Sequence, residues 1–170
     1  MSLEEYRKRV ARLARLRDGK PIFNGTLEHA AVVIENIFAH ATDRVFILSG
    51  KMNPRAYGQD EVLTETKLFL ADGSHRVKIL LESADERDLK EHPFFEQFGD
   101  YENVEVRTVP QDMQEHYDFH FIVMDGDSYR FEEDKTKHAA IAAFGDEEGA
   151  QNLEKIFTIL WERGQPTALP

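Results

Sequence analysis

The chain has 170 residues, of which 41% are hydrophobic and 11% aromatic, and it contains no cysteine. A chain of this length buries roughly two-thirds of its unfolded surface, so we expect one folded domain and not a disordered protein. Disulfides and thiolate metal sites are excluded. No segment approaches the roughly 18 consecutive apolar residues of a membrane span, and the first residues lack the apolar core of a secretory signal. We therefore expect a soluble, cytoplasmic protein with no membrane span.

The net charge of −11 is unevenly distributed along the chain. Residues 1–20 contain seven Lys or Arg against three Asp or Glu, whereas the other 150 residues contain 14 basic and 29 acidic residues, a net charge of −15. An acidic surface repels a phosphate backbone and lacks the counterion release that drives nucleic-acid binding. We therefore expect nucleic acid to bind, if at all, through the N-terminal segment, and a basic partner protein to suit the acidic body.

The first expected element is a basic amphipathic helix over residues 3–17. Apolar residues recur at steps of three and four, with basic residues between them. The apolar positions are Leu3, Tyr6, Val10 and Leu13. The segment lacks the Trp or Phe anchors of an interfacial membrane helix, so we expect it to pack on the acidic body of its own chain or of a second copy. We interpret residues 1–20 as this helix and residues 21–170 as the main domain.

Residues 21–170 alternate helix and strand signals. Helices are expected after the caps Thr26, Asn53 and Asp146, and Pro93 breaks a further helical segment. Strands are expected at the runs "RVFILSG", "RVKILLE", "VEVRTVP", "HFIVM" and "HAAIAAFG", with a tight turn at Asp125-Gly126-Asp127 leading into a short partner strand from Ser128. This order predicts a single α/β domain with a mixed, mostly parallel sheet and helices on both faces.

The stretch "DFHFIVMD" carries the clearest motif. Asp118 and His120 are two apart on an expected strand, so their side chains share a face. The stretch resembles the signature of the phospholipase D-like superfamily, His-x-Lys followed by four residues and Asp. In this register Asp118 takes the His position, His120 takes the Lys position and Asp125 is retained. The order of strands and the closing helix with Phe157 and Trp161 extend the resemblance over residues 25–165.

An alternative register keeps His120 as the signature His. It places Ile122 at the Lys position and Asp127 at the Asp position, which misplaces the apolar run. We prefer the first register. The family's Gly-Ser-x-Asn stretch is missing in either case, because "AAIAAFG" supplies no hydroxyl or amide side chain.

The resemblance implies a phospholipase D-like fold without the usual catalytic residues. Enzymes of that family attack phosphorus with a histidine nitrogen and neutralise phosphate with lysine, whereas Asp118 would repel the substrate. Within residues 112–134 eight acidic residues accompany a single basic residue, Arg130, so we expect this surface not to hold phosphate. We therefore interpret the protein as a non-catalytic interaction or regulatory module, such as an inhibitor, an immunity-type protein or a complex subunit. The alternative is a divergent phosphodiesterase or hydrolase that uses His120 with Asp118 and Asp125.

Three other features are candidate binding sites. Lys51 ends the turn "SGK" after the first central strand, which either cradles an anion or is an ordinary strand-to-helix turn. Arg130 is a second candidate cation. Phe95 belongs to an aromatic cluster that is either core or, if exposed, a partner-binding patch. His116 and His120 would lie about 13 Å apart on a strand, too far to ligate one ion, so we expect no metal and no cofactor.

The family arranges two signature halves face to face, within one chain or between two. This chain has one half and no internal repeat. We therefore expect a homodimer, with the Ala-rich segment Ala139–Ala143 allowing close approach.

Overall fold

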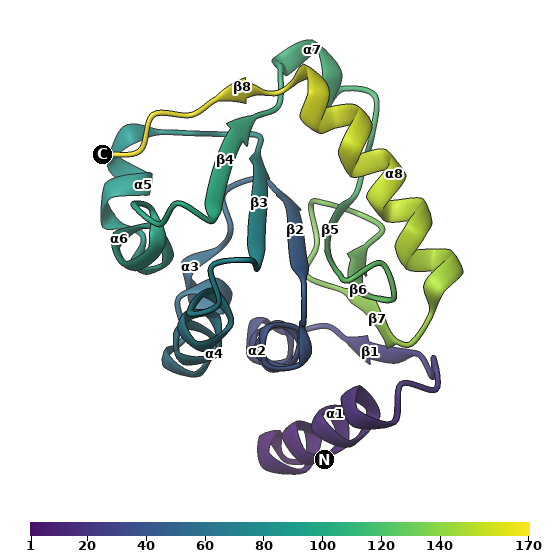
Figure 1. The fold of residues 1–170 in the computed structure, drawn as a ribbon. Coiled ribbons are helices and arrows are strands. Elements are labelled where there is room, and N and C mark those ends of the chain that lie inside the picture. The colour runs from purple at the N-terminus through teal and green to yellow at the C-terminus, as the bar shows by residue number, and fades with distance from the viewer.

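Eight strands form one mixed sheet in the order β1-β7-β6-β5-β2-β3-β4-β8 (Figure 1). The computed structural model describes residues 1–170. The strands are β1 (Ile22–Asn24), β2 (Arg44–Ser49), β3 (Arg76–Leu81), β4 (Val104–Thr108), β5 (His120–Met124), β6 (Ser128–Glu132), β7 (Ala140–Phe144) and β8 (Gln165–Pro166). The helices are α1 (Leu3–Leu16), α2 (Leu27–His40), α3 (Pro54–Tyr57), α4 (Asp60–Leu70), α5 (Glu86–Glu91), α6 (Pro93–Phe98), α7 (Gln111–Gln114) and α8 (Glu147–Arg163).

The mixed sheet is confirmed, but it is not mostly parallel. Only β2 with β3 and β3 with β4 pair in parallel, and the other five pairings are antiparallel. The physical reason lies in the connections. Parallel neighbours need a crossover such as a helix, whereas β5, β6 and β7 follow one another through turns and loops, which favour antiparallel pairing.

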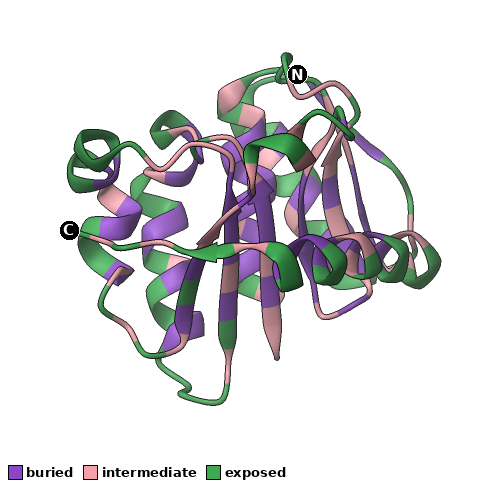
Figure 2. Cartoon of the chain, turned by 90° about the horizontal axis from the view of Figure 1, so that it is seen from above, coloured by how far each residue is buried: buried purple, intermediate pink, exposed green.

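Helices cover both faces of the sheet, as predicted, and side chains of the central strands alternate between two hydrophobic clusters. Val45 and Ile47 of β2 pack in the cluster that includes α2 and α4, whereas Leu48 packs in the cluster that includes α8. We name the two sides the α2 face and the α8 face. Figure 2 shows the central strands largely buried between helices whose outer sides are exposed. Trp161 of α8 is buried, as its position in the helix stripe predicts.

The predicted helix starts are confirmed. Thr26 and Asp146 accept backbone hydrogen bonds at the starts of α2 and α8, and Asn53 caps α3. Pro93 separates α5 from α6, and Asp125-Gly126-Asp127 forms the turn between β5 and β6. The short elements β1, β8 and α7 were not predicted. No helix of the structure combines the length and the apolar character that crossing a bilayer requires.

Helix α1 packs on the body of its own chain. Its apolar side contributes to the same core as α2, and Arg7 forms an ion pair with Glu35 of α2. Arg17, directly after the helix, donates to Asp127 in the turn between β5 and β6 over 2.7 Å. The helix was expected to pack on the body of its own chain or of a second copy. The structure places it on its own chain.

The aromatic cluster at α6 is core. Phe94, Phe95 and Phe98 are all buried, and Phe95 packs edge-on against the ring of His92. Phe95 therefore does not present a partner-binding patch, because the crossover segment folds its ring into the interior.

Candidate functional site

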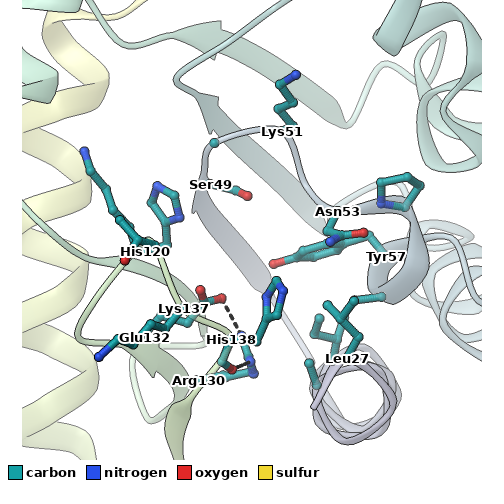
Figure 3. A pocket seen from close by; sticks show the side chains of 17 residues that line it. Leu27, Ser49, Lys51, Asn53, Tyr57, His120, Arg130, Glu132, Lys137 and His138 are labelled. Atoms are coloured by element: carbon teal, nitrogen blue, oxygen red, sulfur yellow. Dashed lines mark hydrogen bonds and ion pairs between the residues drawn. The ribbon is translucent and has the colours of Figure 1, made fainter. Parts of the chain in front are cut away.

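A pocket of approximately 380 Å³ opens on the α2 face, beside the carboxyl end of β2. Helices α2 and α3 form one wall, with Leu27, Ile34 and Tyr57 among its residues. The strands β5 and β6 and the loop from β6 to β7 form the other wall. Figure 3 shows Leu27 and Tyr57 on one side of the pocket and His120, Glu132 and Lys137 on the other.

The lining of the pocket is basic, in contrast to the acidic chain. Four cationic side chains and two histidines line it, whereas Glu132 is the only carboxylate among its lining residues. The cations are Lys51, Arg130, Lys135 and Lys137, and the histidines are His120 and His138. The acidic count over residues 112–134 therefore does not describe the lining of this pocket, although each of its four cations has a carboxylate partner: Asp88, Glu132, Glu82 and Asp134. The acidic count stopped at residue 134, and the fold adds lysines from the next three residues and from the loop after β2.

His120 and Glu82 form the centre of a buried polar cluster. The His120 Nε2 lies 3.1 Å from Glu82 Oε2, and each side chain is 13% exposed. The Nε2 makes no well-aligned hydrogen bond with this carboxylate. Glu82 directly follows β3, and His120 is the first residue of β5, so the edge of the sheet brings together two residues 38 positions apart.

The carboxylate of Glu82 also holds Lys135. The Lys135 Nζ lies 3.3 Å from the same Oε2 and donates to the backbone oxygen of Gln114 over 3.1 Å. Burial raises the pKa of Glu82, but His120, Tyr117 and Lys135 outweigh burial and lower the pKa to about 2. Glu82 is therefore ionised at neutral pH. Its carboxylate holds the side chains of His120 and Lys135 beside the pocket.

Lys135 anchors the loop between β6 and β7. Its ammonium lies 4.6 Å from the centre of the Tyr117 ring, and its backbone N–H donates to the Asp118 oxygen over 2.7 Å. The next residues of the loop, Thr136, Lys137 and His138, are exposed and line the pocket. Lys135 therefore helps to fix the position of this wall.

Arg130 is a fixed cation in the pocket wall, because it is 5% exposed and hydrogen-bonded in three directions. It donates to Asn24 Oδ1 over 3.0 Å. It also donates to Glu132 Oε1 over 2.6 Å and to the His138 oxygen over 3.0 Å (Figure 3). A guanidinium has five N–H donors, so two remain for a ligand or water.

Tyr57, opposite Arg130, is also buried, and burial raises the pKa of its hydroxyl. The hydroxyl therefore stays protonated at neutral pH and can donate to an anion.

Lys51 belongs to a turn that the structure holds firmly. Met52 adopts a left-handed conformation with φ 56°, and its N–H donates to Ser49 Oγ over 2.9 Å. The oxygen of Met52 is bonded by the Nε2 of the buried His92. Lys51 itself is mostly exposed and lies 3.1 Å from Asp88. The turn is thus a strand-to-helix connection that also places an exposed cation in the pocket lining.

The structure does not bring Asp118 and Asp125 to the pocket. Asp118 is exposed ahead of β5 and is not among the lining residues. Asp125 lies at the other end of β5, about 16 Å from His120 by the rise of a strand. Its carboxylate accepts from the N–H groups of Thr42, Asp43 and Arg44 over 2.8–2.9 Å. Asp125 therefore fixes the start of β2, while Asp118 contacts the pocket loop only through its backbone.

No group of three or more His, Asp or Glu side chains has an arrangement that would hold a metal ion.

The comparison with protein families decides the membership of the chain. A family model described as "Domain of unknown function (DUF7931)" matches residues 26–169. The chain belongs to this family. The match begins at the cap of α2 and includes every lining residue of the pocket. No curated protein matches the chain.

Solved structures show which fold this DUF7931 chain has. NucT from Helicobacter pylori is similar with a TM-score of 0.62 and 11% identity over 88% of this chain and 99% of that one. The phospholipase D family member Nuc from Salmonella typhimurium has a TM-score of 0.57 and 12% identity over 86% of this chain and 98% of that one. The chain has the phospholipase D-like fold, as the signature stretch predicted.

An archaeal chromatin protein, TrmBL2, is also similar, with a TM-score of 0.66 and 14% identity. The similarity covers 96% of this chain but only 60% of TrmBL2, so this DUF7931 chain corresponds to part of that protein. At these identities the likeness shows the fold alone.

Proposed function

We propose that this chain is a non-catalytic phospholipase D-like module that binds a phosphate-bearing ligand in the basic pocket and acts by binding, as a regulatory or complex subunit. The observation that carries the proposal is the gathering of Lys51, Arg130, Lys135 and Lys137 around one pocket in a chain with a net charge of −11. Neutralising cations, a protonated Tyr57 and a hydrogen-bonding loop are what a multiply charged oxyanion requires.

The position of Asp118 supports binding over hydrolysis. A histidine that attacks phosphorus must present a nitrogen lone pair to the substrate. Asp118 takes the His position of the signature, carries no such nitrogen and lies outside the pocket, while the Nε2 of His120 faces the Glu82 carboxylate and leaves only Nδ1 for attack. The similar structure of TrmBL2, a chromatin protein that binds DNA, is consistent with a binding role for this fold.

Isothermal titration calorimetry with inorganic phosphate, a phosphomonoester and a phosphodiester tests the proposal. We expect saturable binding that weakens at least about 10-fold in the double variant Lys51→Ala/Lys137→Ala, because each lost charge-assisted contact costs on the order of 1 kcal/mol or more. The matched control is Lys67→Ala/Lys90→Ala, which removes two exposed lysines that are not among the lining residues of the pocket. Equal affinities in the two double variants, or no binding by any phosphate compound, would contradict the proposal.

One observation favours a second candidate function, phosphodiester hydrolysis. His120 and His138 line the same pocket, so a nucleophile and a proton donor are both within the basic site. NucT and a member of the phospholipase D family among the similar structures are consistent with this candidate. It requires turnover of a phosphodiester that is lost in both His120→Ala and His138→Ala. A hydrolysis mechanism that uses Asp118 and Asp125 with His120 is not supported, because neither aspartate lines the pocket.

A further inference from the structure

The outer face of α1 gathers exposed basic side chains, whereas residues 21–170 carry a net charge of −15. The apolar side of the helix is buried, with Val10 and Ala14 fully inaccessible to solvent. Figure 1 shows α1 as an outer layer beyond α2. Its solvent side exposes four basic residues, Lys8, Arg9, Arg12 and Arg15, and the acidic Glu4 and Glu5 of the first turn.

The basic residues of α1 divide into two groups by their ion pairs. Arg7 and the following Arg17 face the body and pair with Glu35 and Asp127. On the outer face only Lys8 has a partner, Glu4 of the same helix, in an exposed contact of 3.4 Å. Arg9, Arg12 and Arg15 form no ion pair, although the rest of the chain has an excess of acidic residues. Three guanidinium groups are therefore free for an external anion.

The spacing of these residues suits an extended row of phosphates. Lys8 and Arg15 are about 10 Å apart along the helix axis at a rise of about 1.5 Å per residue, and Arg12 lies between them. A duplex carries one negative charge per roughly 1.7 Å of its axis, so several phosphates lie within this length. Arginine binds phosphate oxygens in a bidentate manner without requiring a particular base.

We propose that the outer face of α1 is a docking surface for the phosphate backbone of a nucleic-acid duplex, separate from the pocket. A membrane surface fits less well, because an interfacial helix inserts its apolar side and here that side is buried in the core. The acidic body opposes the approach of a long polyanion, so binding is weak and independent of sequence, and it depends steeply on salt.

The test measures the anisotropy of a fluorescein-labelled DNA duplex of about 20 base pairs titrated with the whole chain. For three to four phosphate contacts, raising the salt from about 50 to 200 mM should weaken binding roughly 40- to 150-fold. The triple variant R9E/R12E/R15E should reduce affinity at low salt by at least about 10-fold. A matched control, K67E/K90E/K155E, makes the same change in net charge at exposed lysines on α4, α5 and α8 and should retain more affinity.

Three results would overturn the inference. The first is no binding of the duplex at low salt, and the second is an equal loss of affinity in the two triple variants. The third is binding of the whole chain to anionic lipid vesicles but not to the duplex, which would assign the basic face to a membrane surface. Circular dichroism checks that both triple variants are folded, and all their changes lie on exposed positions.

Discussion

At the scale of single residues, Glu82 is the position on which the pocket depends most. Its carboxylate contacts both His120 and Lys135, and all three side chains are partly buried. We expect Glu82→Gln to lower the free energy of unfolding by roughly 2–4 kcal/mol, because it leaves partly buried basic groups without their counterion. Urea denaturation measures the loss. Glu91→Gln, which breaks an exposed pair with Arg87, is the matched control and should cost under about 0.5 kcal/mol.

The same residue predicts how stability responds to acid. The folded state lowers the pKa of Glu82 to about 2, below its ordinary value. The unfolded chain therefore binds a proton first as the pH falls, and the contribution of Glu82 to stability is complete above about pH 5 and is lost progressively toward pH 2. Wild type should lose more stability than Glu82→Gln over this range. Parallel loss in the two proteins would show that Glu82 does not contribute.

Asp125 separates a structural role from a role in the pocket. It accepts hydrogen bonds from three successive backbone N–H groups and from the Thr42 hydroxyl. Asp125→Ala should lower the free energy of unfolding by about 2–4 kcal/mol, through the unsatisfied N–H groups and the loss of a residue type that tolerates its φ of 55°. Phosphate affinity of the folded variant should be unchanged. A large fall in that affinity in calorimetry would instead place Asp125 in the function of the pocket.

At the scale of elements, His92 connects the junction of α5 and α6 to the turn that carries Lys51. Its Nε2 bonds the Met52 oxygen and its Nδ1 accepts from the Phe94 N–H over 3.1 Å, which requires a neutral ring. Burial lowers the pKa of His92. The unfolded chain therefore takes up a proton below about pH 6.5 before the folded chain does, and stability falls as the pH decreases from that value.

Urea denaturation at about pH 7.5 and 5.5 tests this prediction, since Glu82 does not titrate in that window. The loss of stability on acidification should be smaller in His92→Gln than in wild type. A loss of the same size in both proteins would assign the effect to other histidines.

The sequence predicts the long elements well and the pairing of strands poorly, for physical reasons. Thr26, Pro93 and Asp146 act within a few residues of the helix ends that they set, so local chemistry identifies those ends. The strands β1 and β8 have three and two residues and exist because β7 and β4 offer them a partner. Antiparallel pairing of β5 with β2 likewise depends on contacts between distant segments, which a local pattern does not contain.

The pocket was only partly predictable for the same reason. Lys51, Arg130 and His120 were identified as candidates, and the structure places all three in its lining. Glu82 and Lys135 were missed because they meet His120 only through the fold. The segment "EEDKTKH" contained a usable signal, because its two lysines directly follow the acidic end of β6. The count of charged residues along one stretch did not predict the basic lining of the pocket, because that lining comes from several segments of the chain.

At the scale of the whole molecule, the homodimer remains a prediction. Strand β7, expected to allow close approach, lies inside the sheet between β1 and β6, so it has no free edge for pairing with a second copy. An exposed apolar side chain lies instead on the edge strand, where Phe23 is 71% exposed. Light scattering at micromolar concentration should give twice the chain mass of 19.6 kDa.

If the edge strand contributes to the dimer, Phe23→Ser should lower the measured mass, while Ile159→Ser, at a 60% exposed position of α8, should not. A mass of one chain in wild type would contradict the dimer and leave the acidic surface for a basic partner protein.

The central claim is that the basic pocket binds phosphate without cleaving it. Phosphorus NMR of a phosphodiester mixed with the whole chain tests both parts in one sample. We expect the substrate signal to shift or broaden saturably, less so with Lys51→Ala/Lys137→Ala, and no product signal to grow. A product signal that disappears in His120→Ala and His138→Ala, or a substrate signal unaffected by the protein, would contradict the claim.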